Sequence, residues 1–191
     1  KERAGATTQM EVFYHKYIDN GEDEAPMKAY AERFGYKFIT SWAIFTVLEK
    51  ILTYVDPDHP EEVLTPEDRA VMERLALRTH DAVRIASRHN VTSCSLQDDF
   101  VVLDVNANVY LCCATSTRPT NMIGNYLEMP LSEIQARKRA HRLCSPCMAK
   151  GLPIYFNMAD PAFDEAGNRT RASYQRIPGA PQAPLTIVRT T

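Results

Sequence analysis

The sequence predicts a mixed α/β protein, α+β overall, in which a parallel βαβ unit is followed by helices and then by a small β-hairpin. Three observations carry this prediction: a strand–helix–strand pattern in residues 11–40, helical patterns in residues 42–90, and two short β-type runs beside the cysteines. With 191 residues and 45% hydrophobic composition, the chain can bury a core of its own.

The first strand is predicted in residues 11–20 (EVFYHKYIDN), where aromatic and β-branched residues precede an Asp-Asn-Gly turn. Residues 22–35 carry acidic residues and Pro26 at their start and Gly35 at their end, the usual order of helix start and stop signals. Residues 36–40 (YKFIT) predict a second strand. This order indicates a βαβ unit, which implies a parallel sheet.

Two helices are predicted in the middle of the chain. Residues 42–55 are apolar on almost every face and indicate a buried helix, which the DPDHP loop ends. A long helix is expected in residues 65–90, with Thr65 as N-cap, Pro66 in the first turn and Asp68 three residues after the cap.

The β-type runs are residues 100–105 (FVVLDV) and 108–113 (NVYLCC), and their spacing predicts a hairpin. A short helix is expected in residues 130–142. From residue 157 onward prolines and small polar residues dominate, which predicts an irregular C-terminal tail.

Composition excludes several classes of function. A formal net charge of −2 gives no case for a nucleic-acid partner, and no apolar run approaches the length of a membrane span. The first residues lack a signal-peptide core and an initiator Met, so we expect a cytoplasmic protein of which this chain is a part. No G-x-S-x-G, P-loop or H-E-x-x-H motif occurs.

Clustered thiols are the main candidate for chemistry. The chain has five cysteines, an odd number, of which four occupy two short stretches: Cys94, Cys112, Cys113, Cys144 and Cys147. Inside a cell, clustered cysteines are more often metal ligands or redox groups than disulfides, although a disulfide stays the simple alternative.

The spacing predicts a site with four thiolate ligands. Cys144 and Cys147 form C-x₂-C, which lets two sulfurs bind one centre from a single turn. Cys94 and Cys112 flank the predicted hairpin, whose two ends lie together. Zinc and a 4Fe–4S cluster both accept such a set. A basic run (Arg137, Lys138, Arg139, His141, Arg142) would offset a cluster's negative charge, although most of these side chains are expected on a solvated helix face.

These motifs resemble the auxiliary-cluster region of radical S-adenosylmethionine (radical SAM) enzymes, called SPASM or, in its one-cluster form, twitch. That region has C-x₉₋₁₅-G-x₄-C followed by C-x₂-C. Here the corresponding stretches are DVNANVYLC and NMIGNYLEMPLSEI, within about residues 92–156. Ala107 stands where the family has Gly, so we expect Asn106 or Asn108 to adopt the positive φ of the turn.

The resemblance implies that Cys94, Cys112, Cys144 and Cys147 bind one auxiliary 4Fe–4S cluster, which relays electrons or positions the substrate. It implies four regions: residues 1–55 as the last part of a partial (β/α)₆ barrel, 56–90 as a connecting helix, 91–156 as the cluster domain and 157–191 as the tail. Cys113 is expected to be a small buried hydrophobe.

The family's C-x₃-C-x₂-C motif is absent from this chain. By the resemblance, S-adenosylmethionine and the second 4Fe–4S cluster would therefore bind in a missing N-terminal part, and this chain is not expected to be catalytic alone. The expected partners are a peptide or protein substrate and an electron donor such as a flavodoxin or ferredoxin, with no nucleic acid and no membrane.

Two other readings of the thiols stay open. The first is a structural Cys₄ zinc site in an interaction module, which the long Cys94–Cys112 spacing disfavours. The second is a thioredoxin-like dithiol, disfavoured because C-x-x-C follows a predicted helix.

Outside the cysteines the candidates are weaker. His15, Tyr17 and Asp19 would share one face of the first strand and line a substrate cavity, or else face water. Trp42 is expected in the core. The histidines His59 and His80 are expected at the surface, and His141 is weakly placed near the cluster.

Overall fold

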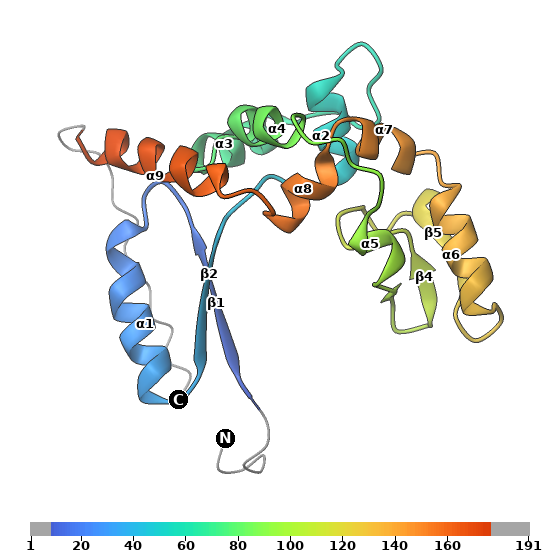
Figure 1. The fold of residues 1–191 in the computed structure, drawn as a ribbon, viewed down its shortest axis with the longest axis horizontal. Helices are drawn as coiled ribbons and strands as arrows, with labels where there is room; N and C mark the ends of the chain where they lie inside the picture. Colours follow the sequence, from blue (N-terminus) through green and yellow to red (C-terminus); the bar gives the residue numbers. More distant parts are fainter. Residues whose placement is uncertain (1–8, 177–191) are drawn as a thin grey trace.

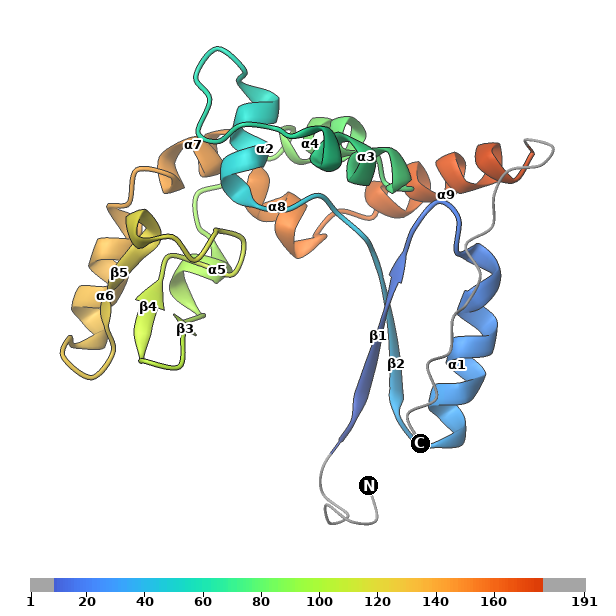
Figure 2. The same cartoon turned by 180° about the vertical axis from the view of Figure 1, so that it is seen from behind.

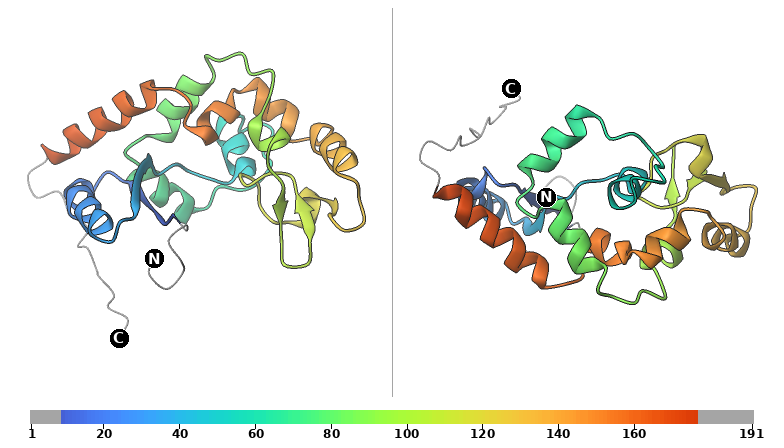
Figure 3. Two further views of the ribbon diagram at one scale, coloured as in Figure 1. Left: turned by 60° about the horizontal axis from the view of Figure 1, so that its bottom comes forward. Right: turned by 90° about the horizontal axis from the view of Figure 1, so that it is seen from above.

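The computed structural model describes residues 9–176, which form a row of helices with a β-containing lobe at either end (Figures 1 and 2). The N-terminal lobe consists of β1 (Glu11–Lys16), α1 (Glu24–Arg33) and β2 (Lys37–Trp42). The other lobe contains the cysteine segments. The helical row joins the two lobes, as the views from other sides also show (Figure 3).

The predicted βαβ unit is confirmed. β1 and β2 pair in parallel, with Tyr14 opposite Thr40, and α1 connects them after the short 3₁₀ turn η1 (Gly21–Asp23). The first strand ends four residues earlier than the 11–20 prediction, because the Asn20 side chain accepts from the Tyr17 backbone N–H at 2.8 Å and closes the turn.

The central helices differ from the prediction in their bounds. Trp42 ends β2, and the helix expected at 42–55 is shorter, α2 (Leu48–Val55). The single helix expected at 65–90 is two helices, α3 (Pro66–Arg74) and α4 (Thr79–Ala86). The capping box of Thr65 and Asp68 is present as predicted.

A run of three apolar residues divides the predicted long helix. Leu75, Ala76 and Leu77 are all buried, and a surface helix cannot turn three successive residues to one core. Leu75 is extended, with φ −73° and ψ 123°, so the chain leaves the helix there and buries the whole run. The split therefore follows from packing.

The predicted hairpin is confirmed, with a third strand added. The antiparallel sheet has the order β3 (Val102–Leu103), β4 (Asn108–Tyr110) and β5 (Met122–Asn125), the last after η2 (Pro119–Asn121). The expectation for the turn is wrong: Ala107 itself has the positive φ of 61°. The carboxylate of Asp104 accepts from the N–H groups of Asn106 and Asn108 and holds this turn.

Helices complete the chain. The predicted helix at 130–142 is α6 (Leu131–Arg139), followed by α7 (Cys144–Ala149) and α8 (Leu152–Asn157). The expectation of an irregular tail at 157–191 is wrong in part, because α9 (Ala162–Gln175) is a regular helix. Residues 177–191 lie outside the described residues. Phe163, Ala166 and Gly167 form the buried stripe of α9, with Gly167 against the Trp42 ring.

A continuous core joins the helices to the cysteine lobe. Leu48 of α2, Leu111 after β4 and Ile134 of α6 are buried in one cluster, to which Cys147 also belongs. Cys112 and Cys144 pack against this cluster. Within residues 9–176 no helix has the length and apolar character that a membrane crossing requires.

Candidate metal centre

Cys144 and Cys147 lie on the same side of α7, one helical turn apart. The Cys147 backbone N–H donates to Leu143 O at 3.2 Å, and the Cys147 side chain is buried. Helix α7 packs against α2 and α8, so these two thiols are fixed between the helical row and the second lobe.

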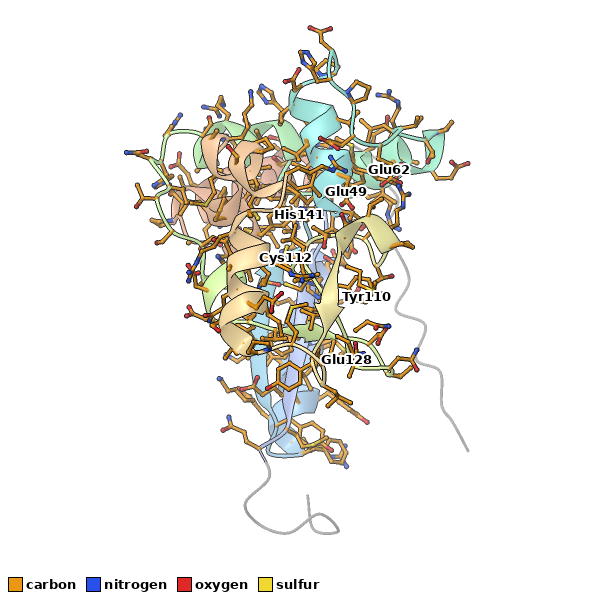
Figure 4. The ribbon with its side chains drawn as sticks, turned by 90° about the vertical axis from the view of Figure 1, so that its right-hand side faces the viewer. Glu49, Glu62, Tyr110, Cys112, Glu128 and His141 are labelled. Atoms are coloured by element: carbon orange, nitrogen blue, oxygen red, sulfur yellow. The ribbon has the colours of Figure 1, made fainter. Side chains whose placement is uncertain are left out.

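Cys112 follows the end of β4, where the backbone is held on both sides. Leu111 N–H donates to Asn121 O at 3.0 Å, and the hydroxyl of Thr115 donates to Cys112 O at 2.9 Å. In Figure 4, Cys112 lies inside the molecule, between α6 and the β-sheet that carries Tyr110.

Cys94 comes from a third segment, at the N-cap of α5 (Ser95–Asp98). Its carbonyl oxygen accepts from the N–H groups of Gln97 and Asp98, both at 3.0 Å. The short helix α5 thus stands between Cys94 and the hairpin. Sequence analysis placed Cys94 directly beside the hairpin, without this helix.

One cavity brings the four predicted ligands together. Its lining includes Cys94, Cys112, Cys144 and Cys147. Apart from the thiols and Gln97, the side chains of the lining are apolar: Leu48, Leu96, Leu111, Ala114, Met148, Pro153 and Phe156. All five cysteines of the chain are free thiols.

Burial governs the pKa values of these thiols. It raises the pKa of Cys112 to about 11, a backbone hydrogen bond from Ala114 opposes the shift, and the charges of Cys113, Cys144 and Cys94 add to it. Burial, followed by the charges of the other three thiols, raises the pKa of Cys147 well above its usual range. Ionisation of any of these thiols is therefore energetically unfavourable unless a cation lies between the sulfurs.

Burial also raises the pKa of Cys144, although Gln97 and Lys138 oppose this shift. A redox dithiol needs the opposite, a lowered thiol pKa. The structure places C-x-x-C at the start of α7 but directly after helix α6 and not after a strand, so the sequence argument against a dithiol stands. The raised pKa adds to it.

Within the basic run, the expectation of a solvated helix face is wrong for Lys138. Its side chain is 1% exposed, and its Nζ donates to Leu96 O at 3.1 Å and to Phe100 O at 2.6 Å. Lys138 lies one helical turn after the buried Ile134, a spacing that identifies the inner face of α6.

The other basic residues of the run do face solvent. Arg137 pairs with Glu133, Arg139 with Asp98 and Arg142 with Glu61. His141 Nε2 lies 3.2 Å from Thr120 O, beside a surface depression that is separate from the thiol cavity.

Cys113 is exposed, so the expectation that it is a buried hydrophobe is wrong. It directly follows Cys112, in a turn that the Thr115 N–H closes by donating to Cys112 O at 3.2 Å. Only Cys112 of this pair belongs to the lining of the cavity.

A buried carboxylate holds the loop that follows Cys112. Glu49 of α2 is 3% exposed and accepts from the Ser116 hydroxyl at 2.6 Å and from the Asn121 side chain. Burial acts to raise the Glu49 pKa, but the hydrogen bonds from Ser116 and Asn121 outweigh it, and the pKa is lowered from 4.5. Sequence analysis missed this network, because the partners Ser116 and Asn121 are far from Glu49 in the sequence.

The remaining candidates lie elsewhere. Because β1 ends at Lys16, Tyr17 and Asp19 lie in the turn and do not share a strand face with His15. His15 is exposed, with Nδ1 3.1 Å from Ser41 Oγ. Trp42 is in the core as predicted, and its Nε1 donates to Asp164 at 2.8 Å. His59 and His80 are at the surface as predicted.

Within residues 9–176, no three cysteine, histidine or acidic side chains are gathered closely enough to hold a single metal ion. Comparisons with protein-family models, with curated proteins and with solved structures find no match to this chain.

Proposed function

We propose that this chain is the auxiliary-cluster region of a radical SAM enzyme, and that Cys94, Cys112, Cys144 and Cys147 bind one 4Fe–4S cluster. The observation that carries the proposal is the common cavity: four thiols from three separate segments line it. Thiolates are the ligands of such clusters, and four of them complete the set.

The lining of the cavity, four thiols among mainly apolar side chains, suits this cofactor. A zinc ion in a Cys₄ site needs every sulfur at about 2.3 Å from one point. A 4Fe–4S cluster is larger, and its four irons each bind one cysteine at the corners of a cube. The thiols here come from three segments and share apolar walls, a lining that supports the proposed cluster.

The N-terminal lobe supports the barrel part of the proposal. Parallel sheets occur almost only with both faces covered, and a sheet of two strands is marginal alone. Here α1 covers one side, whereas Phe13, which alternates with the buried Tyr14, is 59% exposed (Figure 1). We propose that β1 and β2 belong to a larger parallel sheet, the partial (β/α)₆ barrel that the resemblance implies.

Four cysteine ligands leave no iron with an open position, so the proposed role is electron relay. Substrate positioning by the surrounding protein is compatible with it. The proposed substrate is a peptide or protein, and the proposed electron donor is a flavodoxin or ferredoxin. S-adenosylmethionine and its cluster would bind to the part of the enzyme that carries C-x₃-C-x₂-C.

Metal analysis of the reconstituted chain tests the proposal. After anaerobic reconstitution with iron and sulfide, we expect about four irons and four sulfides per chain. The same treatment of Cys113→Ala is the matched control and should give the same content. Stoichiometric zinc, with no iron retained after anaerobic reconstitution, would assign the site to a structural zinc module.

A further inference from the structure

Lys138 is a buried basic residue next to the thiol site. Its neighbours Arg137 and Arg139 reach solvent and pair with acidic residues. Lys138 instead points inward, and within residues 9–176 the structure records no ion pair for it. Its hydrogen-bond partners are the neutral carbonyl groups of Leu96 and Phe100. A buried ammonium is costly unless a negative charge compensates it.

The groups around Lys138 belong to the thiol site. Burial lowers the pKa of Lys138, and the charges of Cys112, Cys144 and Cys94, followed by that of Asp98, oppose this shift. The backbone oxygen of Lys138 accepts from the Cys144 thiol at 3.3 Å and from the Gln97 amide at 3.4 Å. Lys138 therefore contacts the segment after Cys94 with its side chain and the Cys144 segment with its backbone.

We infer that Lys138 is the buried counter-charge of the centre that the four cysteines hold, and that its charge raises the reduction potential of this centre. The inference rests on the proposed function, because it needs the thiolate-bound cluster as the anion. Lys138 acts as a positioning residue in this account, since it binds none of the irons.

The direction of the effect follows from charge. One-electron reduction by dithionite adds one negative charge to the cluster and forms no bond to the protein. A cation in a poorly solvated site stabilises the more negative, reduced form, because its charge is weakly screened there. Removal of the charge should therefore shift the midpoint potential to more negative values.

The test is a redox titration of the anaerobically reconstituted full chain, followed by electron paramagnetic resonance. Lys138→Met keeps the apolar stem and removes the charge, and Lys138→Gln also keeps donors for the two carbonyl groups. We expect both to bind iron as the unaltered chain does and to show a more negative potential. Lys138→Arg keeps the charge and should retain the original potential. Arg139→Met, the exposed control, should not change it.

Other outcomes have defined meanings. Neutral variants that fold normally as apoproteins but bind no iron, while Lys138→Arg does, would support the counter-charge role. Neutral variants with full iron and an unchanged potential would overturn it. Apoproteins of both neutral variants that fail to fold would also overturn it, since Lys138 would then be an anchor for residues 96–100. An unaltered chain that binds no iron would refute the proposed function itself.

Discussion

Cys112 and Cys113 are adjacent in the sequence but differ in their surroundings: Cys112 lines the cavity with three other thiols, and Cys113 is exposed. The backbone that fixes this arrangement is held by Asn121 and Thr115. Substitution of each of these two cysteines in turn therefore tests which of them is the ligand.

We predict that Cys112→Ala loses the cluster, or holds it with three ligands and loses it quickly in air. Cys113→Ala should keep full iron content and change the free energy of unfolding by less than about 0.5 kcal/mol, as expected for an exposed side chain. Iron content and thermal unfolding of the two variants measure this. Retention in Cys112→Ala together with loss in Cys113→Ala would show that the other thiol is the ligand.

Gly151, between α7 and α8, lies against the backbone of α4. It has a φ of +68°, and a Cβ at this position would lie 2.1 Å from Ala86 O. We predict that Gly151→Ala lowers the free energy of unfolding by about 3 kcal/mol, because backbone strain and a backbone collision add together. Gly21→Ala is the control, since its Cβ would meet only flexible side-chain ends.

Chemical denaturation of the two apoproteins measures the difference. Shifted packing of α7 and α8 would also displace Cys144 and Cys147, so Gly151→Ala should bind less iron. Equal stability of both variants would mean that the contact between Gly151 and Ala86 is looser than the structure has it.

Glu49 should make stability dependent on acid pH. The pKa of Glu49 in the folded protein is lowered from 4.5. The stability that the ionised carboxylate contributes is therefore complete above pH 4.5 and is lost as pH falls through the folded-state pKa. We predict that Glu49→Gln is less stable at pH 7 by about 1–3 kcal/mol, because the buried hydrogen bonds weaken. It should also lose less stability on acidification.

Thermal unfolding of the apoprotein between neutral and acid pH measures this slope. Glu32→Gln, at an exposed position of α1, is the control and should keep the slope of the unaltered chain. An equal slope in Glu49→Gln would assign the acid sensitivity to other carboxylates.

We predict that the chain alone does not cleave S-adenosylmethionine with any reductant. In the proposed family this reaction needs an iron with an open coordination position, which a cluster with four cysteine ligands lacks. Formation of 5′-deoxyadenosine by the purified chain, measured by chromatography, would overturn the electron-relay assignment.

Local sequence signals predicted the elements that depend on local chemistry. The capping residues Thr65 and Asp68 located the start of α3, and strand-type runs located the parallel pair and the hairpin. The cysteine spacing predicted four side chains that line one cavity in the structure.

Tertiary packing decided the features that the sequence did not reveal. The break between α3 and α4 exists because three successive residues are buried, and α9 forms because Phe163, Ala166 and Gly167 find a surface that includes Trp42. Lys138 and Glu49 are charged residues whose burial depends on partners distant in sequence, so composition placed them at the surface or gave no signal.

The most direct test of the central claim is a crystal structure of the anaerobically reconstituted chain, with anomalous scattering measured at the iron and zinc absorption edges. The account predicts iron density of a 4Fe–4S cluster in the cavity, bonded to Sγ of Cys94, Cys112, Cys144 and Cys147, with Cys113 unbound. A single zinc ion bound by these sulfurs, or disulfides across an empty cavity, would contradict it.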